Sequence, residues 1–150
     1  MTKTRRVTSG TYPQEIEHLQ GKTLVNFDVQ EIESEDGISY SYEQLLLQKD
    51  APQELIEKEK AKRLEELKKE RRLKALNSIT VTTSNGNTFD GNEASRNNML
   101  CAINASEIFN KTTTEWKLAD NTIVTITLDE LKEALALSIQ KVGEIILNSK

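Results

Sequence analysis

The chain has 150 residues, of which 36% are hydrophobic and 29% are charged, and its formal net charge is −4. This length suits one ordinary domain or a small domain with an appendage, and the lean apolar content predicts that part of the chain stands away from the core. The net negative charge argues against a general nucleic-acid or membrane binder, and no apolar run reaches the length of a membrane span.

Chemically reactive residues are scarce. Cys101 is the single cysteine, so it has no internal disulfide partner, and we expect a buried thiol that acts as a small hydrophobe. His18 is the only histidine, which leaves any nucleophile without a base and any zinc site without a ligand cluster. No Gly-rich phosphate loop or Ser-His-Asp set is present. We therefore predict a protein that is not an enzyme, with no catalytic residues, no cofactor and no metal.

The first 22 residues are polar. They carry Lys3, Arg5 and Arg6, and Tyr12-Pro13 breaks any helix. We expect a mobile or partner-bound arm. Contact of the three cations with nucleic acid is a disfavoured alternative, because no aromatic residues are interleaved with them.

Two segments on either side of Asp36-Gly37 alternate apolar and polar residues, which is the period of a half-buried strand. A type I′ turn at this dipeptide sets Glu35 opposite Ile38 and Val29 opposite Gln44, with the apolar residues on one face. A lone hairpin is marginal in water and needs a partner surface. We predict that this face binds another chain through Val25, Phe27, Val29, Ile38, Tyr40 and Tyr42.

A charged segment follows. Most residues from Glu54 to Lys74 are charged, with several Glu-to-cation pairs at i,i+4, and Pro52 suits a first helical turn. This pattern predicts a helix over about residues 52–76, roughly 36 Å long. Charged residues interrupt every heptad register, so a solvated spacer is favoured. A homo-oligomer through the helix 52–76 and a nucleic-acid-binding helix are the alternatives.

The next segment predicts a hairpin and a helix. A three-residue loop at Ser84-Asn85-Gly86, with Gly86 left-handed, sets Val81 opposite Phe89 and unites the apolar side chains. Asn92 then caps a helix that ends near Asn110. Its predicted buried stripe is Met99, Ala102, Ile103, Ser106 and Phe109.

A second hairpin and helix complete the chain. The predicted turn is Asp120-Asn121, and Thr127 with Glu130 fits a capping box. The inward strand residues are Val124, Ile126 and Leu128, and the helix stripe is Leu128, Leu131, Leu135, Ile139, Val142 and Ile146. The predicted fold is therefore α+β, with a small N-terminal β-hairpin unit (1–50), a charged spacer helix (51–77) and a tandem ββα-ββα two-layer domain (78–150).

Specific residues of this last domain carry a resemblance. They are Phe89-Asp90, then Glu93, Ser95 and Arg96 opening a helix, then Trp116-Lys117-Leu118-Ala119-Asp120-Asn121, Val124-Thr125-Ile126-Thr127 and Leu131. Over about residues 73–148 the chain resembles a small domain of unknown function. That domain recurs at the C-terminal end of proteins encoded in tail modules of tailed phages and prophages. The family has no established catalytic residues, so none is carried over.

The resemblance implies a non-enzymatic tail protein that acts through protein–protein contacts, either as a structural component of the tail or as an accessory of tail-fibre assembly. Its expected partner is a tail or tail-fibre protein, and its expected location is the bacterial host cytoplasm during assembly, or the virion tail. The alternative is a small-ligand-binding or hydrolytic domain that uses a pocket near Trp116 and Asp120.

Overall fold

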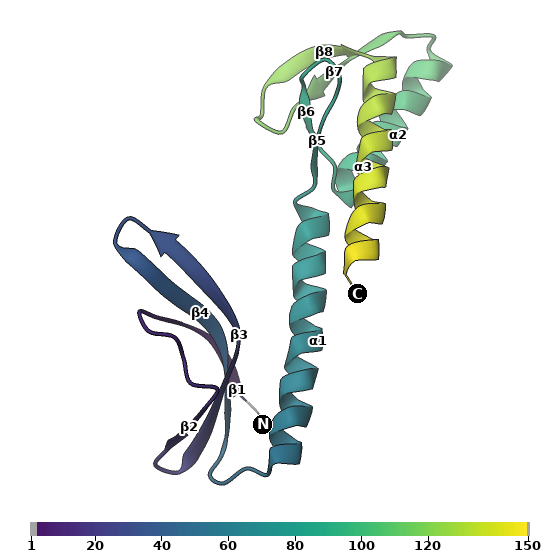
Figure 1. The fold of residues 1–150 in the computed structure, drawn as a ribbon. Coiled ribbons are helices and arrows are strands. Elements are labelled where there is room, and N and C mark those ends of the chain that lie inside the picture. The colour runs from purple at the N-terminus through teal and green to yellow at the C-terminus, as the bar shows by residue number, and fades with distance from the viewer. Residues whose placement is uncertain (1–2, 150) are drawn as a thin grey trace. The chain divides into compact units, whose positions relative to one another are not determined.

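The computed structural model describes residues 3–149, which form eight strands and three helices (Figure 1). All strand pairs are antiparallel, in one four-stranded and two two-stranded sheets. The predicted α+β class is confirmed. Contacts divide the chain into two compact units, with the boundary between Leu67 and Lys68.

The first unit contains a four-stranded sheet rather than a lone hairpin. Its strands are β1 (Lys3–Ser9), β2 (Ile16–Leu19), β3 (Lys22–Ser34) and β4 (Gly37–Gln48), in the order β1-β4-β3-β2. The predicted arm at residues 1–22 is therefore wrong where it is described; Met1 and Thr2 lie outside the described residues. The polar β1 is a strand because it pairs along the long edge of β4, and pairing of this kind overrides composition.

The register of β3 and β4 also differs from the prediction. Ser34 pairs with Gly37, so the loop is Glu35-Asp36, and a β-bulge lies between Phe27 and Gln30. Asp28 in the bulge has a φ of 53° and inserts one extra residue. Because side chains alternate along a strand, this insertion separates the predicted apolar set: Val25 and Phe27 lie on one face, and the residues from Ile38 to Tyr42 that belong to the set lie on the other.

Helix α1 (Gln53–Asn77) covers the face of the sheet that carries Val25. The predicted helix is confirmed, and its residues up to Leu67 belong to the first unit. Ile56 and Leu67 of α1 pack with the buried strand residues Val25, Phe27, Leu45 and Leu47. The first part of α1 is therefore not a fully solvated spacer, because these two apolar residues, about three turns apart on the helix, reach the sheet.

A chain of polar side chains crosses the other face of this sheet. Arg5 Nε on β1 donates to Gln44 Oε1 on β4 at 2.8 Å, Gln44 Nε2 donates to Asn26 Oδ1 on β3 at 3.0 Å, and Asn26 Nδ2 donates to Glu17 Oε1 on β2. Gln44 and Asn26 are buried. Since each member satisfies the next across all four strands, the chain of hydrogen bonds holds the register of the whole sheet.

The second unit follows the predicted order. Its elements are β5 (Thr80–Thr82), β6 (Thr88–Asp90), α2 (Glu93–Ile108), β7 (Thr113–Lys117), β8 (Ile123–Thr127) and α3 (Leu128–Asn148). Both hairpins close with three-residue loops whose last residue is left-handed, Gly86 at 85° and Asn121 at 70°. The predicted pairing of Val81 with Phe89 is confirmed, and the second turn includes Ala119 besides the predicted Asp120-Asn121.

Both predicted helix caps are present. Asn92 Oδ1 accepts a hydrogen bond from the backbone N–H of Ser95 at 2.9 Å, and Thr127 Oγ1 accepts one from the N–H of Glu130 at 3.1 Å. The core of the second unit contains Ile79, Val81, Phe89, Met99, Ile103, Leu118, Ile126, Leu131 and Ala134.

Four residues predicted to be buried are exposed. Cys101 is exposed on α2, and Phe109 is 72% exposed because the helix ends at Ile108 and the chain turns away. On α3, Ile139 and Ile146 are exposed, and Ala134 and Ser138 are buried together with the correctly predicted Leu131. Ser138 packs where Gly91 has no side chain, and this close approach turns α3 about its axis relative to the face predicted from its large apolar residues.

Candidate functional site

The six residues predicted to bind a partner do not form one exposed face. Val25 and Phe27 are buried beneath α1, and Tyr42 is buried on the opposite face of the sheet. Val29 and Tyr40 are half-buried, and Tyr40 packs edge-on against the ring of Tyr12. Only Ile38 is exposed, at 51%. The three buried residues are part of the protein's own core.

The exposed part of this hairpin is its tip, residues 30–38. β2 pairs with β3 only as far as Val25, and β1 pairs with β4 only as far as Tyr40. The tip is therefore two-stranded, and no other strand among the described residues pairs with its edges. Ile32, at 43% exposed, faces one side and Ile38 the other, since they occupy opposite parities of the register. Ile32 was missed because two glutamates flank it.

The tip is acidic. Every charged side chain from Thr23 to Gln48 is an aspartate or a glutamate. Glu33 lies directly opposite Ile38, and Glu31 lies opposite Tyr40, so acidic and apolar side chains share one face. Such a face is suited to a protein partner that brings cations and an apolar residue together.

The pair of residues in the alternative hypothesis, Trp116 and Asp120, does not converge on one pocket. Trp116 is half-buried and packs against the core of the second unit. Asp120 is exposed, and its carboxylate accepts hydrogen bonds from Thr122 Oγ1 at 2.6 Å and from the Thr122 N–H at 2.9 Å, which lower the pKa of Asp120. The hollow beside Asp120, about 550 Å³, is lined by the two hairpin loops and not by Trp116.

Glu130 is a buried carboxylate whose role the capping-box pattern did not predict. Its carboxylate accepts from Thr83 Oγ1 at 2.7 Å, Asn87 Nδ2 at 2.8 Å and Asn85 Nδ2 at 3.1 Å. Burial by itself raises the pKa of Glu130, but these three hydrogen bonds together lower it below its ordinary value. The arrangement ties the loop of the first hairpin to the first turn of α3, which is a structural role.

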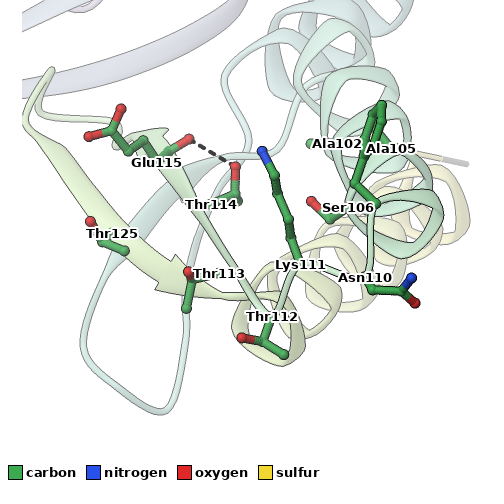
Figure 2. Close-up of a pocket in the computed structure, with 11 residues that line it drawn as sticks. Ala102, Ala105, Ser106, Asn110, Lys111, Thr112, Thr113, Thr114, Glu115 and Thr125 are labelled. Carbon is green, nitrogen blue, oxygen red and sulfur yellow. Dashed lines mark hydrogen bonds between the residues drawn. The ribbon is translucent and has the colours of Figure 1, made fainter.

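A hollow of about 810 Å³ lies between the end of α2 and the strand β7 (Figure 2). Ala102, Ala105 and Ser106 of α2 form one wall, and the segment from Phe109 to Glu115 forms the other. Residues from both faces of β7, Thr113 and Thr114, line it. The hollow therefore follows the edge of the strand.

Lys111 and Glu115 give this groove its charges. In Figure 2 the side chain of Lys111 projects beside β7, and Thr114 Oγ1 donates to the backbone oxygen of Glu115 at 3.5 Å. The Lys111 ammonium lies 6.0 Å from the centroid of the exposed Phe109 ring. The groove thus combines threonine hydroxyls, one cation and one anion with small side chains. Such a lining suits the binding of backbone and charged groups of another chain.

No group of three or more His, Cys, Asp or Glu side chains within residues 3–149 could hold a metal ion. Within the same residues, each helix is too short or too polar to cross a membrane.

Comparison with known proteins gives a family match that begins within α1 and covers most of the second unit. Residues 58–146 match the family model described as "Domain of unknown function (DUF4376)", which covers more than half of the chain. The chain belongs to the DUF4376 family. No curated protein and no solved structure matches it.

The DUF4376 match covers the helical and C-terminal part of the chain and excludes the N-terminal sheet. It includes most of α1, both short hairpins, α2 and nearly all of α3, and it contains Gly91, Glu130 and the groove beside β7. The four-stranded sheet lies outside the matched residues. The acidic hairpin tip therefore belongs to this chain's own N-terminal unit, whereas the groove belongs to the family domain.

Proposed function

We propose that this DUF4376 protein is a non-enzymatic component of a phage or prophage tail module, either a structural tail protein or an accessory of tail-fibre assembly. The proposal rests on the resemblance of residues 116–121 and 124–127 to domains encoded in such modules. In this proposal the protein acts through protein–protein contacts, in the host cytoplasm during assembly or in the virion tail.

One observation supports a binding role for the N-terminal unit. The tip of the β3–β4 hairpin exposes an isoleucine on each face, Ile32 and Ile38, and its two edges have no strand beside them among the described residues. Unpaired backbone groups and exposed apolar side chains together favour contact with another chain, by edge pairing or by face packing. Val25, Phe27 and Tyr42 support this tip from the core and are not its contact residues.

The test is binding of the full-length protein to the tail-fibre protein encoded beside it. We expect Ile38→Lys or Ile32→Lys to weaken binding at least about tenfold, since a central apolar contact is often a hot spot. Leu147→Lys is the matched control, because Leu147 is also an exposed apolar residue but lies on α3. Point variants are preferable to deletion of residues 1–50, which would uncover Ile56 and Leu67.

The outcomes separate two claims. If the wild-type protein does not bind the tail-fibre protein, the proposed tail function is wrong. If it binds and both tip variants bind equally well, the tail function stands and the hairpin tip is not the contact surface.

A further inference from the structure

The edge of β7 that faces away from β8 has no strand beside it among the described residues. The N–H of Leu118 donates to the Thr122 oxygen at 2.8 Å, and the N–H of Leu128 donates to the Thr112 oxygen at 2.9 Å. Even-numbered residues of β7 thus bond to β8, and alternation directs the backbone N–H and C=O of Thr113, Glu115 and Lys117 outward. β8 is the only strand of the described chain that pairs with β7.

This free edge has a definite length. The N–H of Ala119 donates to the Thr88 oxygen at 3.0 Å, so the edge is already occupied beyond Lys117. At the other end the groove of about 810 Å³ opens beside Thr112 to Glu115. A strand edge that has no partner strand and lies next to an open groove is a template for one more strand.

We propose that this edge pairs with the same edge of a second copy of the protein, which joins two β7–β8 hairpins into one four-stranded antiparallel sheet. The inference goes beyond the proposed tail function and does not depend on it. A twofold axis through Trp116 sets Glu115 opposite Lys117 of the second copy, and Lys117 opposite its Glu115. Both residues are exposed and share the solvent face of the hairpin.

Charge selects this register. A twofold axis through Glu115 would set two Glu115 carboxylates directly opposite each other, and like charges in such positions destabilise a sheet. The axis through Trp116 instead gives two opposite-charge pairs, and both Glu115 and Lys117 have their backbone groups directed outward. The strands then overlap over residues 114–118, between the start of β7 and the occupied Ala119.

The groove fits the rest of this arrangement. At each end of this overlap, the loop that contains Asp120 of one copy lies near the segment before β7 of the other copy, which contains Lys111. Asp120 and Lys111 are both exposed and of opposite charge. The exposed Phe109, which lines the groove, would gain cover from the incoming loop.

The first test is the association state of the full-length protein in sedimentation equilibrium, from low micromolar to near-millimolar concentration. We expect the wild-type protein to approach twice its mass of 17.0 kDa. Glu115→Lys and Lys117→Glu should each raise the dissociation constant about tenfold or more, because each turns two attractive pairs into repulsive ones. An equimolar mixture of the two variants should dimerise again, since each Lys then faces a Glu.

The second test addresses the backbone. Glu115→Pro removes an outward N–H that makes no bond to β8, a position at which edge strands accept proline, and Glu115→Ala is its matched control. We expect the proline variant to be monomeric and the alanine variant to retain weaker association, with circular dichroism confirming that both are folded. A monomeric wild-type protein at the highest concentration, a mixture that associates no better than its components, or equal association of the Pro and Ala variants would each overturn the proposal. Should the proline variant not fold, the charge exchange alone decides.

Discussion

The close packing of α3 against Gly91 predicts that alanine destabilises the protein at Gly91. At Gly143, in the same unit, alanine should stabilise it. A β-carbon at Gly91 would lie 2.6 Å from Ile79 Cγ2, 2.7 Å from Ser138 Oγ and 3.1 Å from Ser138 Cβ. Ile79 and Ser138 are buried, so neither side chain can swing into solvent. The backbone of Gly91 is also held, since its N–H donates to the Ile79 oxygen at 2.7 Å and its oxygen accepts from Arg96 Nη1 at 2.7 Å.

The magnitude follows from overpacking. Forcing one methyl group into a close-packed contact costs about 1–3 kcal/mol, and the lower chain entropy of alanine in the unfolded state returns only about 0.4–1 kcal/mol. We therefore predict that Gly91→Ala destabilises the second unit by about 1–2 kcal/mol. For a unit of this size that loss lowers the melting temperature by on the order of 10 °C.

Gly143→Ala is the matched control. Gly143 lies within α3, and nothing lies within 4 Å of the position that its β-carbon would take. Alanine is favoured over glycine inside a helix by about 0.8–1.0 kcal/mol, so this variant should raise the melting temperature. Thermal unfolding followed by circular dichroism compares the two. If Gly91→Ala melts at or above the wild-type temperature, the steric argument is refuted, and Ser138 is not what orients α3.

Three further predictions concern the same chain. Because hydrogen bonds hold the pKa of Glu130 below its ordinary value, its stabilising contribution is present above the unfolded pKa and is lost as the pH falls through the folded pKa; acid titration of wild type and Glu130→Gln should show a smaller loss in the variant. Phe89→Ala should cost about 3–5 kcal/mol in urea unfolding, and Trp116→Ala less, since Trp116 is only half-buried; equal costs would contradict the burial argument. Amide exchange should be faster at residues 57–63 of α1 than at residues 131–142 of α3, and uniform protection along α1 would instead indicate a bundled helix.

The second unit was predictable where a short stretch of sequence carries its own physical cause. A left-handed Gly86 closes the three-residue loop, and a side-chain oxygen on Asn92 or Thr127 satisfies an N–H of the first helical turn. Each of these features depends on residues at most a few positions apart. Local chemistry of this kind therefore predicted the first hairpin loop, the helix starts and the pairing of Val81 with Phe89.

Contacts distant in sequence were not predictable in the same way. The face of α3 that is buried depends on Gly91, which lies 47 residues before Ser138. In the first unit, the bulge at Asp28 depends on a left-handed φ that aspartate only occasionally adopts. The Arg6 guanidinium, which bonds Asp28 Oδ2 at 2.7 Å, supports that conformation from another strand. A one-dimensional pattern contains no signal for such a partner.

The candidate binding surfaces were also not predictable from sequence patterns. Apolar alternation predicted Val25 and Phe27 as contact residues, but alternation reports only that a face is covered, and α1 covers it. Neither of the two proposed binding segments stands out by hydrophobicity, since Ile32 lies between Glu31 and Glu33 and the strand 113–117 is mostly polar. Both segments nevertheless have edges that no strand of the described chain pairs with. Availability for binding is a property of topology: a strand is free to take a partner only where the sheet order leaves it at an edge. In this protein the β3–β4 tip and the β7 edge have no strand beside them among the described residues, and we propose both for contacts with other chains, whereas the apolar strand residues Val25 and Phe27 lie in the core.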